Sequence, residues 1–214
     1  MSIIREEKET KIISFIGMEQ CDILYYISDY GIKQGKKVLV VDNSFSNDMY
    51  KAFTTIEDGV FVEIGDLMVV KDIQYNENFY SKFDYVFVYH GMNLEKESYE
   101  KSDYLYVMTN YMPVQVEKIK EIPLDKDRVH HMIFRDKVLK KITEDYIVET
   151  IGIQAGDTYV LNVEPKDVEL YMLIVYDSFR KLVGCSQEMY DMLLKAGMEI
   201  YDIEEKQMRK IMRK

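Results

Sequence analysis

The segment Ile12–Ser44, IISFIGMEQCDILYYISDYGIKQGKKVLVVDNS, has the pattern of a strand, a loop, a helix and a second strand. The apolar runs Lys11–Gly17 and Lys36–Asp42 are continuous rather than alternating, which is typical of parallel strands buried on both faces. Between them, apolar residues recur at helical spacing from Ile23 onward, and Gly35 ends the helix. Two parallel strands joined by a helix form a βαβ unit, the repeating element of doubly wound sheets.

The same alternation of apolar runs and amphipathic segments continues along the chain. Further strands are expected at Gly59–Gly65, Phe83–Gly91, Asp103–Asn110, Arg128–Phe134 and Thr158–Glu164. Helices are expected at Ser46–Thr54, Asn93–Lys101, Val114–Ile122, Leu139–Gly152, Lys166–Gly184 and Ser186–Lys214, the last broken near Gly197. This order predicts one α/β domain over residues 1–214, a doubly wound and mostly parallel sheet of about seven strands with helices on both faces.

The composition is that of a globular protein, because hydrophobic residues make up 47% and charged residues 31% of the 214. The net charge of −10 argues against general nucleic-acid binding, which needs a basic face. Cys21 and Cys185 have no metal or redox spacing, so we expect reduced thiols. The charged N-terminus does not have the pattern of a signal peptide, and no apolar run approaches the roughly 18 residues of a membrane span. We therefore expect a cytoplasmic protein.

In open α/β sheets, ligands bind beyond the carboxyl ends of the strands. In this chain those ends are at Gly17–Cys21, Asp42–Ser44, Tyr89–Asn93 and Thr109–Pro113, so any chemistry is expected there. His90 lies in one of these segments. We interpret it as a half-buried histidine that fills a pocket, because no second histidine or acid pair has ligand spacing near it.

In their order and wording, these segments resemble those of the ParA/MinD-type P-loop ATPases. KIISFIG…GIKQGKKVLVVDNS resembles the family's first strand, P-loop helix and second strand, and YSKFDYVFVYHG is similar to the strand before switch II. The family's next strand and helix resemble the segment KSDYLYVMTNYMPVQVEKIKEI. Its last strand and closing helices resemble VEPKDVELYMLIVYDSFRKLVGCSQEMYDMLLK. The resemblance covers nearly the whole chain. It implies a P-loop NTPase-like fold, a dimer formed across the nucleotide face, and a role in placing larger assemblies.

The phosphate-binding residues that the resemblance implies are missing. A P-loop needs small residues whose backbone N–H groups wrap the phosphates, a lysine for the β- and γ-phosphates, and a Ser/Thr hydroxyl for Mg²⁺. Counted back from Gly35, the lysine position is Gln20, the hydroxyl position is Cys21 and the preceding glycine is Glu19. Gly17 is the only glycine left, and the loop is about three residues shorter than that pattern.

The metal-binding positions implied by the resemblance are altered as well. Where the family has an aspartate at the end of its switch II strand, this chain has Tyr89, followed by His90. Of the carboxylate pair after the second strand, Asp42 remains, but Ser44 takes the second position. Phosphoryl transfer depends on stabilisation of charge by metal and lysine. We therefore expect no catalytic residue, bound cofactor or metal in the vestigial pocket, which comprises Gly17, Glu19, Gln20, Cys21, Asp42, Ser44, Tyr89 and His90.

These losses favour a non-catalytic binding, scaffolding or localisation module of a larger bacterial assembly, such as a pilus, secretion or partition system. The pilus-localising TadZ-like branch, which includes proteins with eroded P-loops, offers one analogy. Protein partners are expected, and a homodimer is left open. The alternative is a nucleotide-binding ATPase or sensor with a site rebuilt around Asp42, Tyr89 and His90. A flavodoxin-like or receiver-like module ranks last, because the first strand ends in Gly17–Met18–Glu19 rather than in clustered acids.

The C-terminal segment, residues 186–214, leaves two interpretations open. Apolar residues recur near its end beside lysines and arginines: Ile200, Ile203, Met208, Ile211 and Met212. A basic amphipathic helix suits a partner groove or peripheral contact with the anionic inner face of the membrane. We favour a terminal helix packed on the sheet, because Glu204 and Glu205 interrupt the basic character and cations near a helix C-terminus are stabilised by the dipole.

Overall fold

The computed structural model describes residues 10–53, 59–94, 99–138, 141–176 and 184–214, and a single sheet forms its centre. Within these residues the sheet has eight strands in the order β3-β4-β2-β5-β1-β6-β7-β8. Every neighbouring pair is parallel except β3 and β4, which are antiparallel. The strands are β1 Lys11–Gly17, β2 Val38–Asp42, β3 Phe61–Ile64, β4 Leu67–Lys71, β5 Tyr85–Gly91, β6 Tyr104–Thr109, β7 His131–Lys137 and β8 Asp157–Asn162.

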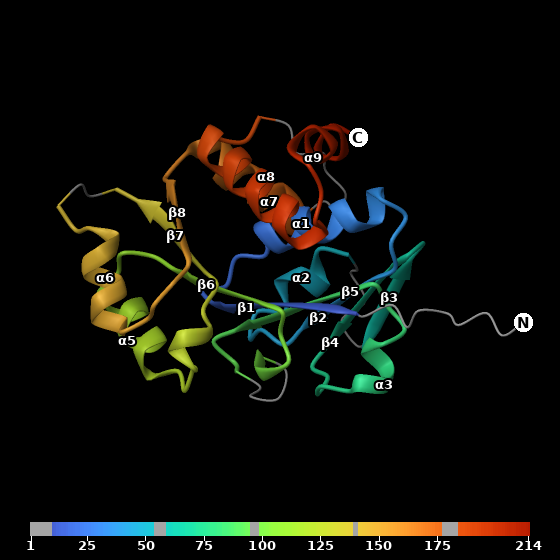
Figure 1. Ribbon diagram of the computed structural model, residues 1–214, viewed down its shortest axis with the longest axis horizontal. Helices are drawn as coiled ribbons and strands as arrows, with labels where there is room; N and C mark the ends of the chain where they lie inside the picture. The colour runs from blue at the N-terminus through green and yellow to red at the C-terminus, as the bar shows by residue number, and fades with distance from the viewer. Residues whose placement is uncertain (1–9, 54–58, 95–98, 139–140, 177–183) are drawn as a thin grey trace, which may run out of the picture.

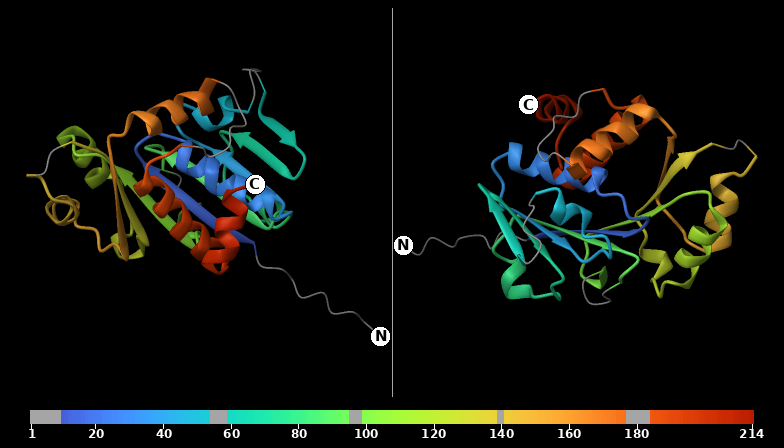
Figure 2. Two further views of the ribbon diagram at one scale, coloured as in Figure 1. Left: turned by 90° about the horizontal axis from the view of Figure 1, so that it is seen from above. Right: turned by 180° about the vertical axis from the view of Figure 1, so that it is seen from behind.

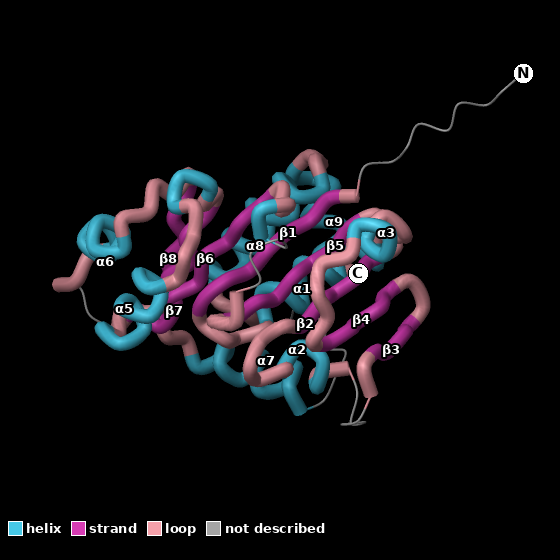
Figure 3. Tube along the Cα trace, turned by 90° about the horizontal axis from the view of Figure 1, so that it is seen from below, coloured by secondary structure: helices cyan, strands magenta, loops and turns pink. Residues whose placement is uncertain are grey.

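Helices cover both faces of the sheet, and two further views show the same layers (Figures 1 and 2). One layer contains α1, α7, α8 and α9, which share a core cluster with the central strands. On the opposite face, α5 and α6 cover the β6–β7 half, and α3 lies over the other half (Figure 3). The helices are α1 Asp22–Lys33, α2 Asp48–Lys51, α3 Glu77–Tyr80, α5 Pro113–Glu121, α6 Glu144–Ile151, α7 Pro165–Tyr176, α8 Gln187–Tyr201 and α9 Glu205–Met212.

The burial of the central strands explains why continuous apolar runs in the sequence predicted them correctly. β1 lies between β5 and β6 and pairs in parallel with both. All residues of β2 and β5 are buried, as are those of β1 from Ile12 onward. A strand with neighbours on both edges and side chains packed on both faces has no solvated side, so its sequence does not alternate. The mostly parallel, doubly wound sheet expected from the sequence is confirmed.

The sheet has eight strands rather than about seven, because β4 was missed. Gly65 and Asp66 connect β3 to β4, and Gly65 has a φ of 61°, so the two strands form a tight hairpin. β3 had been expected at Gly59–Gly65, and β4 follows it too closely to stand out as a separate apolar run. The other expected strands are present, with bounds shifted by up to three residues.

The helices differ from their expected bounds by more residues than the strands do. The helix expected from Ser46 is the short α2, and Thr54 lies outside the described residues. Residues 95–98, 139–140 and 177–183 also lie outside them, so parts of three expected helices are not described. The helix expected from Leu139 begins at Glu144, because the Thr143 hydroxyl accepts the Tyr146 N–H at its N-cap.

The C-terminal segment breaks at residues 202–204 rather than near Gly197. Asp202 ends α8 with a left-handed φ of 52°, whereas Gly197 lies inside α8. A Cβ at Gly197 would lie 2.5 Å from Met208 Cε, so this glycine permits the close approach of α9. Met208, Ile211 and Met212 are buried in the core, which agrees with the packed-helix interpretation. Among the described residues, no helix has the length and apolar character needed to cross a bilayer.

Candidate functional site

The carboxyl ends of β1, β2 and β5 bring most of the expected pocket residues to one edge of the sheet. Tyr89 is the register partner of both Phe15 on β1 and Asp42 on β2, so these strands end at the same level. The loop after β1 leads directly into α1, whose N-terminus therefore faces this edge (Figure 1). The arrangement matches the place where doubly wound sheets bind ligands.

Gly17 holds the loop after β1 close to β6. Its φ is 108°, a conformation that residues with side chains rarely adopt. A Cβ at this position would lie 2.1 Å from the Met108 carbonyl oxygen and 2.7 Å from Ile119 Cδ1. The next residue, Met18, donates its N–H to the same Met108 oxygen at 2.9 Å. Gly17 thus serves a tight backbone approach.

Glu19 links the loop after β1 to the loop after β2. Its carboxylate accepts the N–H of Phe45 at 3.1 Å and that of Ser46 at 2.9 Å. A Cβ at Gly91, the end of β5, would lie 2.5 Å from Glu19 Oε1. The side chain therefore lies against the end of β5 and is bonded to the loop that follows β2.

The N-terminus of α1 is surrounded by carboxylates of the same chain. Asp48 of α2 accepts the Cys21 N–H at 3.3 Å, and Asp22 accepts the Ile23 N–H at 2.9 Å. Arg135, at the end of β7, forms a two-armed ion pair with Asp22, and Arg135 Nη2 lies 2.8 Å from Asp22 Oδ2. Asp22 is fully buried and Arg135 is 5% exposed. Carboxylates are favoured near the positive end of a helix dipole.

Arg135 and Asp48 were missed by the sequence analysis. Arg135 is a charged residue at the end of the apolar run HHMIF, at the carboxyl edge of a predicted strand, and this was the available signal. Asp48 had no such signal, because the short α2 carries it back to α1 only in three dimensions. Both residues make hydrogen bonds at the N-terminus of α1, beside the residues that were predicted.

Asp42 and Ser44 form a local hydrogen-bonded unit at the end of β2. Asp42 accepts the backbone N–H of Ser44 at 3.1 Å, its hydroxyl at 2.6 Å, and the Tyr50 N–H at 2.9 Å. Burial raises the pKa of Asp42 to about 7 despite these hydrogen bonds, which lower it. Burial also raises the pKa of Asp48, while its bonds from Ser46 and other donors lower it.

Tyr89 and His90 lie on opposite faces of β5, so the structure does not bring both to Asp42. Tyr89 is fully buried in the cluster that contains α1, and its hydroxyl has no hydrogen-bond partner among the described residues. His90 is also fully buried, rather than half-buried as expected. Its Nε2 lies 3.3 Å from the Ser14 hydroxyl on the other face.

The remaining candidates do not add a metal site. Within the described ranges, no group of three or more His, Cys, Asp or Glu side chains could hold a metal ion. Cys21 is buried and Cys185 half-buried, and neither forms a disulfide. Burial raises the pKa of both thiols.

The burial of His90 predicts a pH-dependent stability. Burial lowers the pKa of His90 to about 4, so the folded chain keeps the imidazole neutral while the unfolded chain takes up a proton near pH 6.5. The stability that the fold gains by burying the neutral imidazole is fully present above pH 6.5. It is lost as the pH falls toward 4, because protons bind preferentially to the unfolded chain. Between pH 7.5 and 4.5 we expect a loss of about 2–3 kcal/mol. Urea unfolding at several pH values should show a shallower decline for His90→Gln than for wild type, and parallel curves would contradict the assignment.

Comparisons with known proteins identify the fold. No protein-family model matches the chain, and no curated protein matches its sequence. Among solved structures, it is similar to a ParA family ATPase from Chlorobium tepidum, with 13% identity, a TM-score of 0.57, and coverage of 89% of this chain and 98% of that one. The MinD cell division protein of Aquifex aeolicus has 16% identity, a TM-score of 0.57, and coverage of 87% and 96%.

A third solved structure is the MinC:MinD cell division protein complex of Aquifex aeolicus. It has 14% identity and a TM-score of 0.54, with coverage of 76% of this chain and 85% of that one. Identities this low establish architecture and not activity. The chain has the P-loop NTPase-like fold of the ParA/MinD-type ATPases.

Proposed function

We propose that this protein is a non-catalytic relative of the ParA/MinD-type ATPases, a pseudo-ATPase that acts through protein partners. The observation that carries the proposal is the occupation of the α1 N-terminus by the chain's own carboxylates. Asp48 and Asp22 already accept the N–H groups of Cys21 and Ile23, at the place where a P-loop binds phosphate. A phosphate would have to displace them.

The charges around this edge also oppose a nucleotide. Four carboxylates gather at it, those of Glu19, Asp22, Asp42 and Asp48, and each already accepts a backbone N–H group of this chain.

Described cations also lie near this edge. The terminal nitrogens of Arg135 are bound to Asp22, and Lys51 donates to the Ser46 carbonyl oxygen. Lys118 lines the outer hollow, beside the Glu19 carboxylate. Gln20, at the lysine position, brings no charge. Phosphoryl transfer needs positive charge at the phosphates, so the residues present do not fit Mg²⁺-ATP.

We propose a binding or scaffolding role for the chain and a location in the cytoplasm. The side chains that this edge exposes support the binding role. Phe45, in the loop after β2, is 73% exposed, and it borders an open hollow of about 470 Å³ together with Met92 and Glu19. Aromatic and methionine side chains are common anchors of protein interfaces. The similar MinD structure was solved in complex with MinC, which supports a protein partner by analogy of fold. A homodimer, a TadZ-like role at a pilus, and a secretion or partition assembly are specific forms of this proposal.

The proposal is tested by thermal unfolding with ATP, ADP and GTP, each with and without Mg²⁺. We expect no change in melting temperature at millimolar ligand, because a ligand stabilises only the state that binds it. Mg²⁺ alone is the matched control. A saturable, Mg²⁺-dependent rise would contradict the proposal and favour the alternative of a rebuilt nucleotide site. Loss of that rise in Asp42→Asn would then place the ligand at the end of β2.

A further inference from the structure

A small polar cavity lies where the carboxyl ends of β7 and β8 meet α7. Its volume is about 30 Å³, and six of its nine lining side chains carry a charged or amide group. Gln20 reaches it from the loop after β1, Arg135 and Asp136 from the end of β7, and Asp167 and Tyr171 from α7. Three parts of the chain that are far apart in sequence therefore share this space.

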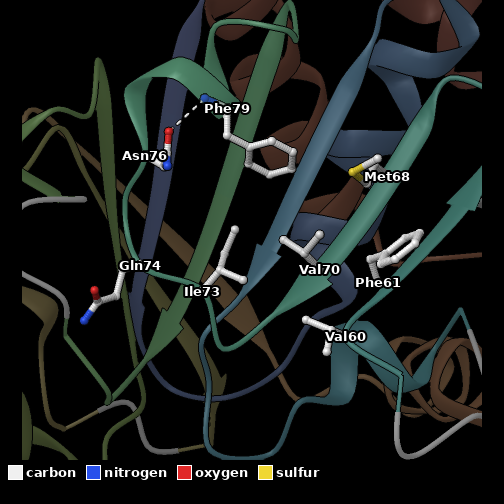
Figure 4. Close-up of a pocket in the computed structure, with 8 residues that line it drawn as sticks. All are labelled: Val60, Phe61, Met68, Val70, Ile73, Gln74, Asn76 and Phe79. Atoms are coloured by element: carbon white, nitrogen blue, oxygen red, sulfur yellow. Dashed lines mark hydrogen bonds between the residues drawn. The ribbon is translucent and has the colours of Figure 1, made fainter.

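The size and lining of this cavity restrict its occupant much more than those of the groove between α3 and the β3–β4 hairpin (Figure 4). That groove has a volume of about 430 Å³, and six of its eight lining side chains are apolar. Asn76, one of its two polar side chains, already accepts the Phe79 N–H at the start of α3. An open apolar lining selects no particular ligand, whereas a small polar cavity does.

A β-bulge in β7 opens the space for the cavity. The register between β7 and β8 shifts between Phe134 and Lys137, so Arg135 and Asp136 stand opposite Leu161 alone. Asp136 has a left-handed φ of 57°. A bulge bends its strand and changes the direction of its side chains, which separates the ends of β7 and β8 beside Arg135.

Two buried polar atoms at this cavity have no hydrogen-bond partner among the described residues. The terminal nitrogens of Arg135 bind Asp22, but its Nε–H is unpaired, and the whole side chain is buried. The Oε1 of Gln20 is buried and unpaired as well. Because an unsatisfied buried donor or acceptor is costly, both atoms indicate a partner inside the cavity.

The chemistry of these two atoms determines what that partner is. The Arg135 Nε–H needs an acceptor, which a metal ion or an ammonium ion does not offer. The Gln20 Oε1 needs a donor, which a simple anion does not offer, and the carboxylates of Asp136 and Glu164 on the same lining also oppose an anion. A neutral molecule that both donates and accepts fits, and about 30 Å³ is the volume of one water molecule in the liquid.

We propose that the cavity binds a buried water molecule, which accepts the Arg135 Nε–H and donates to Gln20 Oε1. Its second hydrogen is donated to a carboxylate of the lining, which gives the roughly three hydrogen bonds typical of buried water. Gln20, at the position of the P-loop lysine, is then a structural residue that ties the loop after β1 to the bulge of β7. The proposal goes beyond the proposed function, because it holds whether or not the nearby edge binds nucleotide.

A high-resolution crystal structure of the full chain tests the site directly. We expect one water molecule at about 2.7–3.2 Å from both Arg135 Nε and Gln20 Oε1. In solution, the Arg135 Nε proton should show a nuclear Overhauser effect to water, with the sign of a long-lived bound molecule. The proposal is overturned if rearranged side chains fill the cavity, if the water contacts only one of the two atoms, or if this effect is absent.

Gln20→Met tests whether the water bridge stabilises the fold. Methionine has nearly the length of glutamine but lacks the amide acceptor, so the melting temperature should fall by about 2–6 °C. Gln207→Met on α9 is the matched control, because Gln207 is exposed, and its melting temperature should change by at most about 1 °C. Equal changes in the two variants would contradict the role of Gln20. All measurements are made without nucleotide, so their outcome is separate from that of the nucleotide titration.

Discussion

Replacing Arg135 with methionine is expected to lower the free energy of unfolding by about 3–5 kcal/mol. Arg135 and Asp22 are both buried, and the guanidinium contacts both carboxylate oxygens. Without the arginine, Asp22 would be a buried charge that keeps the hydrogen bond from the Ile23 N–H. Removing one partner of a buried ion pair destabilises a protein far more than the intact pair stabilises it. Urea unfolding monitored by circular dichroism measures the change.

Two further variants show whether the buried pair causes this loss. Asp22→Leu combined with Arg135→Met removes both charges, so the double variant should be more stable than Arg135→Met alone. Arg209→Met removes an arginine from the exposed pair with Glu205 and from its contacts with the Tyr190 ring and hydroxyl, and we expect a loss of at most about 1 kcal/mol. Equal losses in Arg135→Met and Arg209→Met would mean that burial of the pair is not the cause.

The fold was largely predictable because its signals are local. A parallel strand buried on both faces is a continuous apolar run, and that signal located β1, β2, β5, β6 and β7 from sequence. β4 was missed because a two-residue turn separates it from β3. The two strands are so close in sequence that only one strand was predicted there. The break between α8 and α9 was misplaced because Gly197 was interpreted as a helix end. Only the packing of Met208 against it explains why a glycine lies there.

The position of the candidate site at the carboxyl ends of the strands could be predicted from sequence, whereas several of its residues and most of their contacts could not. The strand ends and the resemblance identified Gly17, Glu19, Asp42 and Tyr89, and the structure places these residues at one edge. The partners of each side chain depend on residues far apart in sequence, as with Asp22 and Arg135, which are 113 positions apart. His90 shows the opposite error. Its neighbour Tyr89 faces the site, and the two-residue period of a strand turns His90 to the other face.

Replacing Gly17 with alanine is expected to lower the free energy of unfolding by about 3–5 kcal/mol, because its Cβ would make the closest backbone overlap of the described glycines. A left-handed φ strains any residue with a Cβ, and at Gly17 that Cβ would also overlap the Met108 carbonyl oxygen at 2.1 Å. The oxygen cannot move freely, because it accepts the Met18 N–H and belongs to the β1–β6 ladder. For a domain of this size, the melting temperature should fall by about 10 °C.

Gly65→Ala is the matched control, because Gly65 has a φ of 61° and no atom within 4 Å of the added Cβ. It carries the backbone strain without the overlap, so its loss should be about 1 kcal/mol. Similar losses at both positions would mean that the backbone conformation alone requires glycine at position 17.

The comparison shows whether glycine at position 17 is needed for a ligand or for packing against β6. In a P-loop, glycine is needed for the approach of phosphate, whereas here the neighbouring strand already requires it. A large loss at Gly17 in the absence of any nucleotide would show that packing against β6 is sufficient to retain the one glycine of this loop.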